Sequence, residues 1–390
     1  MLRNRITYAF VLVLAALALV RSNSPVAFAA LVVMVAVPAA CYAAARVAAQ
    51  STKLSFSIPA ACTVDQSLGM SIDVTRRQGF LKGRVRLSFD IHNLLMRSVG
   101  QQEITLGLGA GAEERYVLPM STVCVGHTVI TLAKAQVSDP LGLFSLPLHN
   151  AVFEGSYTVY PRLVDLSVES AHSARFSHAG FTYDTRRKGN DPTELFDLRG
   201  YEEGDTLTAI HWKLSAKMDD LVVRESSHPT DYDIVLLCDA HVCDITDLDH
   251  IALLNATMSL TASVSVGLCR QGQGHSVAYT DEGTLTAEPV DTMASFEEML
   301  DVLMSSPLPL SPTMDTTPFL IYKRDHSVTK TVFITDIINE ELLVHLGELT
   351  DLSVLQVSAE GEALVDSGGA YLLSHIPVDA VGTRIKNVML

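Results

Sequence analysis

Two uncharged apolar runs near the N-terminus most constrain what this chain can fold into. The first comprises residues 6–20, ITYAFVLVLAALALV, and the second comprises residues 26–45, after the break SNSP. In the hydrocarbon core of a bilayer, backbone N–H and C=O groups must bond within their own segment, so such runs cross as helices. At about 1.5 Å per residue, the second run covers a core of roughly 30 Å. The sequence therefore predicts a transmembrane helical hairpin over residues 1–50, with one helix in each run.

The charges that flank this hairpin predict its orientation. Arg3, Arg5, Arg46 and Lys53 lie on its outer flanks, and only Arg21 lies in its turn. Because Lys and Arg favour the cytoplasmic side, we expect both ends and the bulk of the chain in the cytoplasm. A cleaved signal peptide is the alternative, since Arg3 and Arg5 precede an apolar run. However, a second apolar run follows at once, and a mature soluble protein would expose it.

Composition narrows the classes of function. The chain of 390 residues has a formal net charge of −16. Nucleic-acid binding depends on Lys and Arg that neutralise phosphates, so we expect no nucleic-acid partner. Six cysteines are scattered without a Cys-x-x-Cys pair. This spacing favours reduced thiols and gives no support to a zinc site.

Residues 51–166 are expected to form an all-β domain. The stretch Arg84–His92 alternates polar and apolar residues with period two, and Gly, Pro, Asn and Asp separate it from shorter candidates. Short, regularly spaced strands of this kind are typical of an antiparallel sandwich of immunoglobulin-like or fibronectin-like type. The shorter strands are predicted over 71–75, 103–108, 116–118, 127–132 and 157–160. We assign this domain to spacing or protein contact, because its sequence contains no catalytic triad or phosphate-binding loop.

Residues 231–390 are expected to form a doubly wound α/β domain. Two continuous apolar runs, Asp233–Asp239 and Lys330–Asp336, suit central parallel strands that are buried on both faces. Helical and strand patterns alternate around them, which implies βαβ units. Further helices are predicted over 248–270, 296–304 and 340–346, and further strands over 276–279 and 353–357.

Asp239 and Asp336 each end one of the two central strands and are the candidate metal ligands. Open α/β sheets bind ligands at the carboxyl ends of their strands. The alternation resembles the von Willebrand factor type A fold, whose metal-binding members use Asp-x-Ser-x-Ser after the first strand. Here His241 and Cys243 replace both serines. Mg²⁺ and Ca²⁺ need several oxygen ligands, so we expect a degenerate site and no bound cofactor. Alternatively, the two aspartates cap loops or helices.

The segment between these domains, residues 167–230, contains the longest motif, RRKGNDPTELFDLRGYEEGDTLTAIHWKLSAKMDDLVVR. Apolar residues at spacing two over Thr208–Lys217 favour a strand, although the same residues also suit a short helix. In one interpretation the motif serves packing, with Trp212 as a buried anchor. In the other it is a recognition surface for a partner or an anionic ligand. The candidate interaction residues are Arg199, Tyr201, Gly204, Asp205, His211, Trp212, Ser215 and Lys217.

The motif resembles the core signature of the bacterial family catalogued as domain of unknown function 58. That signature has an Arg and a Tyr, then Gly-Asp, then Ile-x-Trp, then Ser-Ala and a basic residue. This sequence matches it at Arg199, Tyr201, Gly204, Asp205, Ile210, Trp212, Ser215, Ala216 and Lys217. The turn DPLGLF at 139–144 and the tripeptide YPR at 160–162 also resemble the family. The resemblance implies a C-terminal von Willebrand factor type A-like domain and, as a partner, a cytoplasmic AAA+ ATPase of the MoxR type.

These observations predict a membrane-tethered adaptor without enzymatic activity. We expect it to lie in the inner or plasma membrane with two passes and to contact lipid through the hairpin. It would bind a MoxR-type AAA+ ATPase during assembly or remodelling of envelope or other protein complexes. Two alternatives stay open. One is an extracytoplasmic adhesion or envelope-structure protein, with the hairpin inserted the other way. The other is a metal-dependent or thiol enzyme that uses Asp239, His241 or Cys243.

Overall fold

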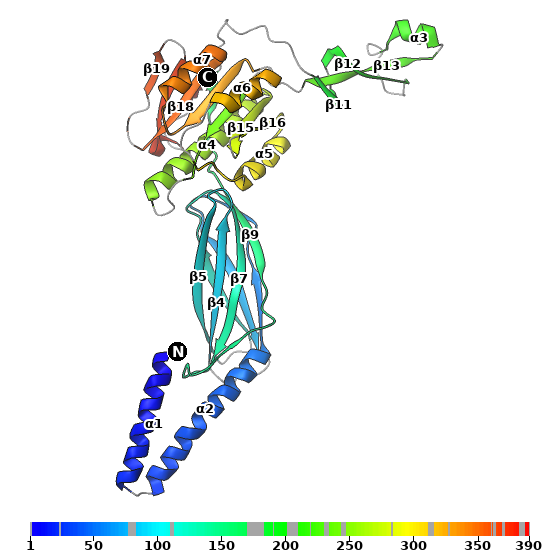
Figure 1. Cartoon of the computed structure of the whole chain (residues 1–390). Coiled ribbons are helices and arrows are strands. Elements are labelled where there is room, and N and C mark those ends of the chain that lie inside the picture. The colour runs from blue at the N-terminus through cyan, green and yellow to red at the C-terminus, as the bar shows by residue number, and fades with distance from the viewer. Residues whose placement is uncertain are drawn as a thin grey trace. The chain divides into compact units, whose positions relative to one another are not determined.

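The structure, a computed structural model, divides into two compact units, Met1–Tyr160 and Pro161–Leu390 (Figure 1). It describes residues 2–22, 25–76, 83–109, 113–169, 183–189, 191–200, 210–218, 220–229, 234–242, 247–281, 284–310, 316–326, 328–359, 361, 364–368, 371–381 and 387–389.

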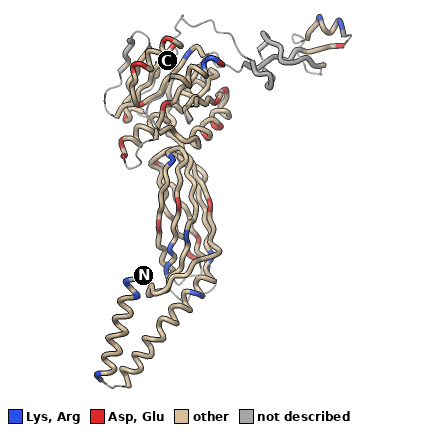
Figure 2. The backbone as a smooth tube through the Cα atoms, viewed as in Figure 1, with Lys and Arg blue, Asp and Glu red and all other residues tan. Residues whose placement is uncertain are grey.

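Two apolar helices open the first unit, α1 (Leu2–Ser22) and α2 (Pro25–Ser51). Both are long and apolar enough to cross a membrane, with a mean hydropathy of 1.5 in α1 and 2.3 in α2. Only 0% and 6% of these stretches is buried within the protein. Figure 2 shows that both helices carry Lys or Arg only towards their ends. The two predicted helices are therefore present, and each is longer than the apolar run that predicted it.

The rest of the first unit is the predicted β-sandwich. One sheet has the order β1-β3-β6, and the other has the order β2-β9-β7-β4-β5, with β8 paired to β7. The pairings are antiparallel except between β2 and β9. Period-two alternation turns one face of each strand inward, so Leu87 and Phe89 of β4 are buried in one core with Met70 and Ile72 of β3. The strands are β1 (Thr52–Ser57), β2 (Ala61–Thr63), β3 (Leu68–Arg76), β4 (Gly83–Asn93), β5 (Ser98–Leu108), β6 (Glu113–Met120), β7 (Gly126–Ser138), β8 (Ser145–Pro147) and β9 (Glu154–Tyr160).

The turn between β7 and β8, residues 139–144, joins the sandwich to both helices, and we call it the docking turn. The buried Asp139 carboxylate accepts hydrogen bonds from two backbone N–H groups of the turn, at 3.0 and 2.6 Å. Arg5 of α1 donates to a backbone carbonyl of the turn at 2.6 Å and lies 5.8 Å from the ring of Phe144. Tyr42 of α2 meets the same ring edge-on at 5.6 Å. The family-like motif DPLGLF therefore fixes the helices against the sandwich.

The second unit is built around a seven-stranded sheet of order β16-β15-β14-β17-β18-β20-β19. The strands from β15 to β20 pair in parallel, and β16 and β19 pair antiparallel at the two sides. This arrangement confirms the predicted α/β class. The elements are β14 (Ile234–Asp239), α4 (Leu248–Arg270), β15 (His275–Asp281), β16 (Thr284–Val290), α5 (Met293–Ser305), α6 (Thr316–Asp325), β17 (Lys330–Thr335), α7 (Glu340–Leu349), β18 (Asp351–Ser358), β19 (Leu364–Gly368), β20 (Tyr371–Pro377) and a 3₁₀ turn (Val378–Ala380), with a separate parallel pair of β10 (Ser167–Glu169) and β21 (Asn387–Met389).

The sequence did not predict β16, α6, β19 and β20, nor the short β10, β21 and 3₁₀ turn. Pro289 lies within β16 and obscures its strand pattern, yet a side strand of a sheet tolerates Pro. Pro318 lies in the first turn of α6, where a missing N–H breaks no helical bond. These two prolines are compatible with the elements only because of where each one lies.

Helix α4 also has the length and apolar character of a membrane span, with a mean hydropathy of 1.5, but 83% of it is buried. It contacts β14, β15, β17 and β18. Its buried hydroxyls bond within the helix, for example Thr261 to the carbonyl of Thr257 at 2.8 Å. Asp247 caps its N-terminus by accepting from the backbone N–H of Asp249. Helix α4 is therefore the central core helix of this unit.

A separate antiparallel sheet carries the signature segment, with β11 (Tyr183–Gly189), β13 (Val222–Pro229) and β12 (Asp191–Gly200) in that order. Of the two predictions for Thr208–Lys217, the strand is wrong and the short helix is confirmed as α3 (Trp212–Met218). Only Ile210 forms a strand-like bridge, to Val223. The chain then turns helical because the N–H groups of residues 214 and 215 both bond to the carbonyl of residue 211.

Candidate functional site

The carboxyl ends of β14 and β17 bring the two predicted aspartates to one edge of the sheet. The strands are parallel neighbours, and Asp239 pairs in register with Thr335. Asp336 follows directly, so both carboxylates lie at the same edge, as the sequence predicted. The Thr335 hydroxyl donates a hydrogen bond to Asp239 Oδ2 at 2.9 Å. It also accepts one from the N–H of Ile337 at 3.1 Å. Thr335 therefore ties the end of β17 to the carboxylate of β14.

Burial dominates the electrostatics of Asp239. The pKa of its carboxyl group is raised to about 7: burial is the largest cause, the hydrogen bond from Thr335 opposes the shift, and the nearby charge of Asp336 adds to it. An ionised carboxylate is expensive to bury without a strong positive partner, and the proton relieves that cost. Near neutral pH, Asp239 is therefore protonated in a large share of molecules.

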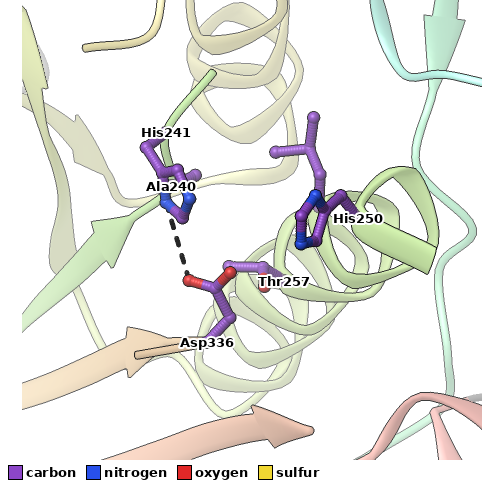
Figure 3. A pocket seen from close by; sticks show the side chains of 6 residues that line it. Ala240, His241, His250, Thr257 and Asp336 are labelled. Carbon is purple, nitrogen blue, oxygen red and sulfur yellow. Dashed lines mark ion pairs between the residues drawn. The ribbon is translucent and has the colours of Figure 1, made fainter. Parts of the chain in front are cut away.

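A shallow pocket lies beside these carboxylates (Figure 3). Its walls come from the end of β14, from α4 and from the residue after β17. His241 Nδ1 lies 3.7 Å from Asp336 Oδ1, and both side chains are 18% exposed. The pocket has about 10 Å³ of internal volume, room for about one water-sized group. The lining residues are Ala240, His241, His250, Leu254, Thr257 and Asp336.

The donor set of this pocket does not fit a Mg²⁺ or Ca²⁺ shell. Such ions take six or more oxygen ligands. Among the residues that the structure describes, no three His, Cys, Asp or Glu side chains lie close enough to hold a metal ion. The Thr257 hydroxyl is engaged with the carbonyl of Leu253 at 2.9 Å, and Asp239 is hydrogen-bonded to Thr335. We therefore assign no metal-dependent chemistry to this edge. Cys243, the candidate nucleophile, lies outside the described residues.

Three exposed apolar side chains lie in segments next to the residues that line the pocket. Leu310 is 73% exposed and follows Pro309, whose carbonyl accepts from the N–H of Val242 at 2.9 Å. Leu248 is 68% exposed at the start of α4, and Ile337 is 36% exposed next to Asp336. We call Leu248, Leu310 and Ile337 the apolar rim. Sequence reasoning did not find this rim, because no periodic pattern marks three residues that come from three separate segments of the chain.

The signature residues separate into a structural group and a surface group. The buried Ser215 accepts from the N–H of Val222 at 2.9 Å, so it fastens α3 to β13. Ile210 is 4% exposed. In contrast, Trp212 is 62% exposed, so the expectation of a buried anchor is wrong. The helix turns the indole away from the bonds that hold α3 in place. His211 is half-buried, and its Nδ1 accepts from the N–H of Leu214 at 3.3 Å.

The structure describes only some of the remaining signature residues. Lys217 is exposed on α3. Arg199 pairs with Val223 through the β12–β13 ladder, but its side chain lies outside the described residues. Tyr201, Gly204 and Asp205 also lie outside them. Lys213, which sequence reasoning did not single out, is exposed beside Trp212.

Comparisons with solved structures returned weak likenesses. The CARDB domain of a Pyrococcus furiosus protein, solved with di-metal ions, is 16% identical, with a TM-score of 0.20, over 28% of this chain and 86% of that one. A cohesin module from a Clostridium perfringens family 33 glycoside hydrolase is 11% identical, with a TM-score of 0.19, over 28% and 96%. A Listeria innocua beta-glucosidase is 12% identical, with a TM-score of 0.20, over 28% and 15%. At these TM-scores the likenesses carry no inference.

No curated protein matches the chain. A family match does exist, and it covers residues 197–362, from the signature segment through most of the α/β sheet. It includes Trp212, the aspartates at the carboxyl edge and the pocket. Residues 197–362 of this chain therefore belong to the family described as "Protein of unknown function DUF58".

Proposed function

We propose that this protein is a membrane-anchored adaptor without enzymatic activity, which presents the carboxyl edge of its α/β sheet to a protein partner. The observation that carries the proposal is the surface at that edge. A pocket with room for about one water-sized group has the apolar rim in the segments next to its lining residues, and the neighbouring carboxylate of Asp239 accepts a hydrogen bond from Thr335. Exposed apolar side chains that gather on one face of a protein are typical of protein-binding surfaces.

The two N-terminal helices supply the anchor in this proposal. Most of their surface is not covered by protein, and their apolar character suits lipid. We further propose that both ends of the hairpin face the cytoplasm, because four of its five flanking cations, Arg3, Arg5, Arg46 and Lys53, lie on that side and only Arg21 lies in the turn. The α/β unit would then be accessible to cytoplasmic proteins.

The partner that we propose is an AAA+ ATPase of the MoxR type, which the resemblance to the family implies. The adaptor would hold this ATPase at the membrane while it assembles or remodels a complex. The net charge of −16 supports a protein partner over a nucleic acid.

A capture experiment tests the rim as the binding surface. Tagged full-length protein is purified from membranes in mild detergent, and bound proteins are identified by mass spectrometry. We expect an AAA+ ATPase with the wild type and its loss with Leu310→Glu, because a charge in an apolar contact is costly to desolvate. Val117→Glu is the matched control, since Val117 is also an exposed apolar residue, at 66%, but lies on the sandwich.

A reporter fused after Leu390 tests the orientation in the same cells. Activity confined to the cytoplasm supports the proposal. Activity only outside the cytoplasm, or an ATPase that binds the Leu310→Glu variant as well as the wild type, contradicts it.

A further inference from the structure

The junction of α3 and β13 carries a small surface with an aromatic ring and two cations. The bridge between Ile210 and Val223, with the bond from His211 N–H to the carbonyl of Val222, brings the start of α3 next to the start of β13, which Leu221 precedes. Trp212 is 62% exposed and Leu221 is 40% exposed. We call the set of Trp212, Lys213, Lys217 and Leu221 the tryptophan tip.

The exposure of the tip is not a sign of a loose segment. Ser215 is buried, and its hydroxyl accepts from the N–H of Val222 at 2.9 Å and donates to the carbonyl of His211 at 3.1 Å. Val222 and Val223 are buried as well. The tip is thus held on an ordered base while its one large ring faces solvent. Tryptophan is usually largely buried, and it is enriched among the residues that dominate binding interfaces.

Lys213 and Lys217 bring positive charge to this surface. They are exposed and four residues apart, so they lie on one side of α3, about 6 Å apart along the axis. The exposed Asp220 next to Leu221 adds one carboxylate, so the two lysines outnumber the acidic side chain described at the tip, in a chain with a net charge of −16. A matching partner surface must offer carboxylates at similar spacing beside exposed apolar groups.

The exposed face of α5 in the same chain has these features. Glu297, Glu298 and Asp301 are exposed there, and the first and last are also four residues apart. Met293 and Val302 on this face are 46% and 41% exposed. Figure 2 shows acidic residues along this helix.

Helix α5 is also fixed in place, so its acidic face is ready for contact. A capping box between Thr292 and Ser295 secures the N-terminus of the helix. Its opposite face buries Phe296, Met299 and Leu303. A rigid acidic face loses little conformational freedom when a partner binds it.

We propose that the tryptophan tip of one copy binds the exposed face of α5 in a second copy, and that the contact is reciprocal, so that it closes at a dimer. The indole would pack on Met293, which lies one turn before Glu297 on the same side of α5, since thioether sulfur packs well against aromatic rings. Lys213 and Lys217 would pair with the carboxylates of α5. Two identical contacts related by a twofold axis use both surfaces of each copy, so the assembly stops at two copies. The inference does not depend on the identity of any other partner.

Trp212 is the only tryptophan in the chain, so its fluorescence reports this contact directly. The experiment follows acrylamide quenching of full-length protein in detergent as its concentration rises, with sedimentation of the same samples. We expect Trp212 to become shielded as the dimer forms. Trp212→Ala should weaken the dimer about 30-fold, as for a central interface residue worth about 2 kcal/mol.

Charge reversal separates this contact from association through the hairpin. Lys213→Glu with Lys217→Glu should weaken the dimer at least about tenfold. Adding Glu297→Lys and Asp301→Lys to that chain should restore it, because the same pairs form with reversed sign. The matched control, Arg84→Glu with Lys134→Glu, changes the net charge equally at exposed positions of the sandwich and should leave the dimer unchanged.

Several results would overturn the proposal. These are a Trp212 that stays open to quencher at every concentration, or a dimer that is insensitive to the lysine reversal. The proposal is also overturned if the added reversal of the α5 carboxylates fails to restore the dimer, provided that this variant unfolds at the wild-type temperature. Shielding that appears only when vesicles with 30% phosphatidylglycerol are added would assign the tip to lipid instead. None of these results depends on whether an ATPase is captured, so the adaptor proposal is tested separately.

Discussion

Asp239 combines an exposed edge of the fold with a buried carboxyl group. It ends β14 at the carboxyl edge of the sheet, where open α/β sheets bind ligands, but burial raises its pKa to about 7. Between pH 3.8 and about 7, the folded protein therefore keeps a proton on the Asp239 carboxyl group that the unfolded chain, in which the pKa is 3.8, releases. The resulting stabilisation is complete below pH 3.8 and is lost as pH rises through about 7.

This linkage predicts that Asp239→Asn makes the second unit more stable at pH 8. Asparagine keeps an oxygen that can accept from Thr335 and carries no charge to bury. The gain is expected to be at most about 4 kcal/mol, from about 1.4 kcal/mol for each unit of the pKa shift. Urea unfolding followed by circular dichroism from pH 5 to 8 measures it. Equal pH slopes for the variant and the wild type would show that Asp239 is not protonated in the folded state.

His275 produces the opposite pH dependence in the same unit. It is fully buried, its Nε2 lies 2.7 Å from the hydroxyl of Ser265, and its Nδ1 lies 3.0 Å from the carbonyl of Gln273. Burial lowers its pKa below the model-compound value of 6.5, against smaller raising effects of Gln273 and Asp291. The folded protein thus keeps the imidazole neutral, and this stability is present above pH 6.5 and is lost as pH falls towards the lowered pKa.

We therefore expect His275→Gln to flatten the loss of stability between pH 6.5 and 5, even if it lowers stability at pH 8. The reason is that glutamine binds no proton in the unfolded chain. The same urea experiment over the acid range measures the slope. His345→Gln on the exposed face of α7 is the control, and it should leave the acid slope as in the wild type. An unchanged slope in His275→Gln would assign the acid sensitivity to other groups.

At the scale of elements, the docking turn joins two parts that the sequence presents as separate. Gly142 has φ +67°, in the left-handed region, and a Cβ there would lie 2.9 Å from the side-chain nitrogen of Asn4 in α1. The turn can approach the helix this closely only because residue 142 has no side chain. The motif was read from the sequence as a turn into a strand, which is correct. Its contact with α1 involves residues 138 positions apart, and no local pattern reports it.

The turn predicts a specific effect of Phe144→Ala. This change removes the edge-on contact with Tyr42 and the contact with Arg5, at a cost of about 1 to 2 kcal/mol. Hydrogen exchange of the backbone N–H groups in residues 139–145 should become faster. Leu141→Ala is the control, because Leu141 is 48% exposed and bonds to Asn4 only through its backbone carbonyl. If both variants exchange at the wild-type rate, the ring does not hold the turn.

At the scale of the whole molecule, three helices in the described part of the chain have the length and composition of membrane spans, and burial separates them. Only 0% and 6% of the spans in α1 and α2 is buried, against 83% in α4. Apolar surface that no protein covers must meet lipid or another apolar partner. We therefore expect α1 and α2, and not α4, to hold the chain in the membrane.

Cell fractionation checks this expectation. The full-length chain should stay in the membrane pellet after an alkaline carbonate wash, and a chain without residues 2–51 should move to the supernatant. Release of the full-length chain by carbonate would exclude integral anchoring by these helices. Retention of the shortened chain would point to a second attachment in the remaining residues.

The sequence by itself determined the two apolar helices, the sandwich and the alternating α/β unit, because the periods of burial are properties of neighbouring residues. It also placed Asp239 and Asp336 at one edge, since the ends of parallel strands meet there. Only the tertiary structure decided that Thr335 bonds to Asp239 across 96 positions, that α4 is a core helix and that Trp212 faces solvent. Burial, and the pKa values that follow from it, depend on contacts between distant residues, which no local pattern in the chain records.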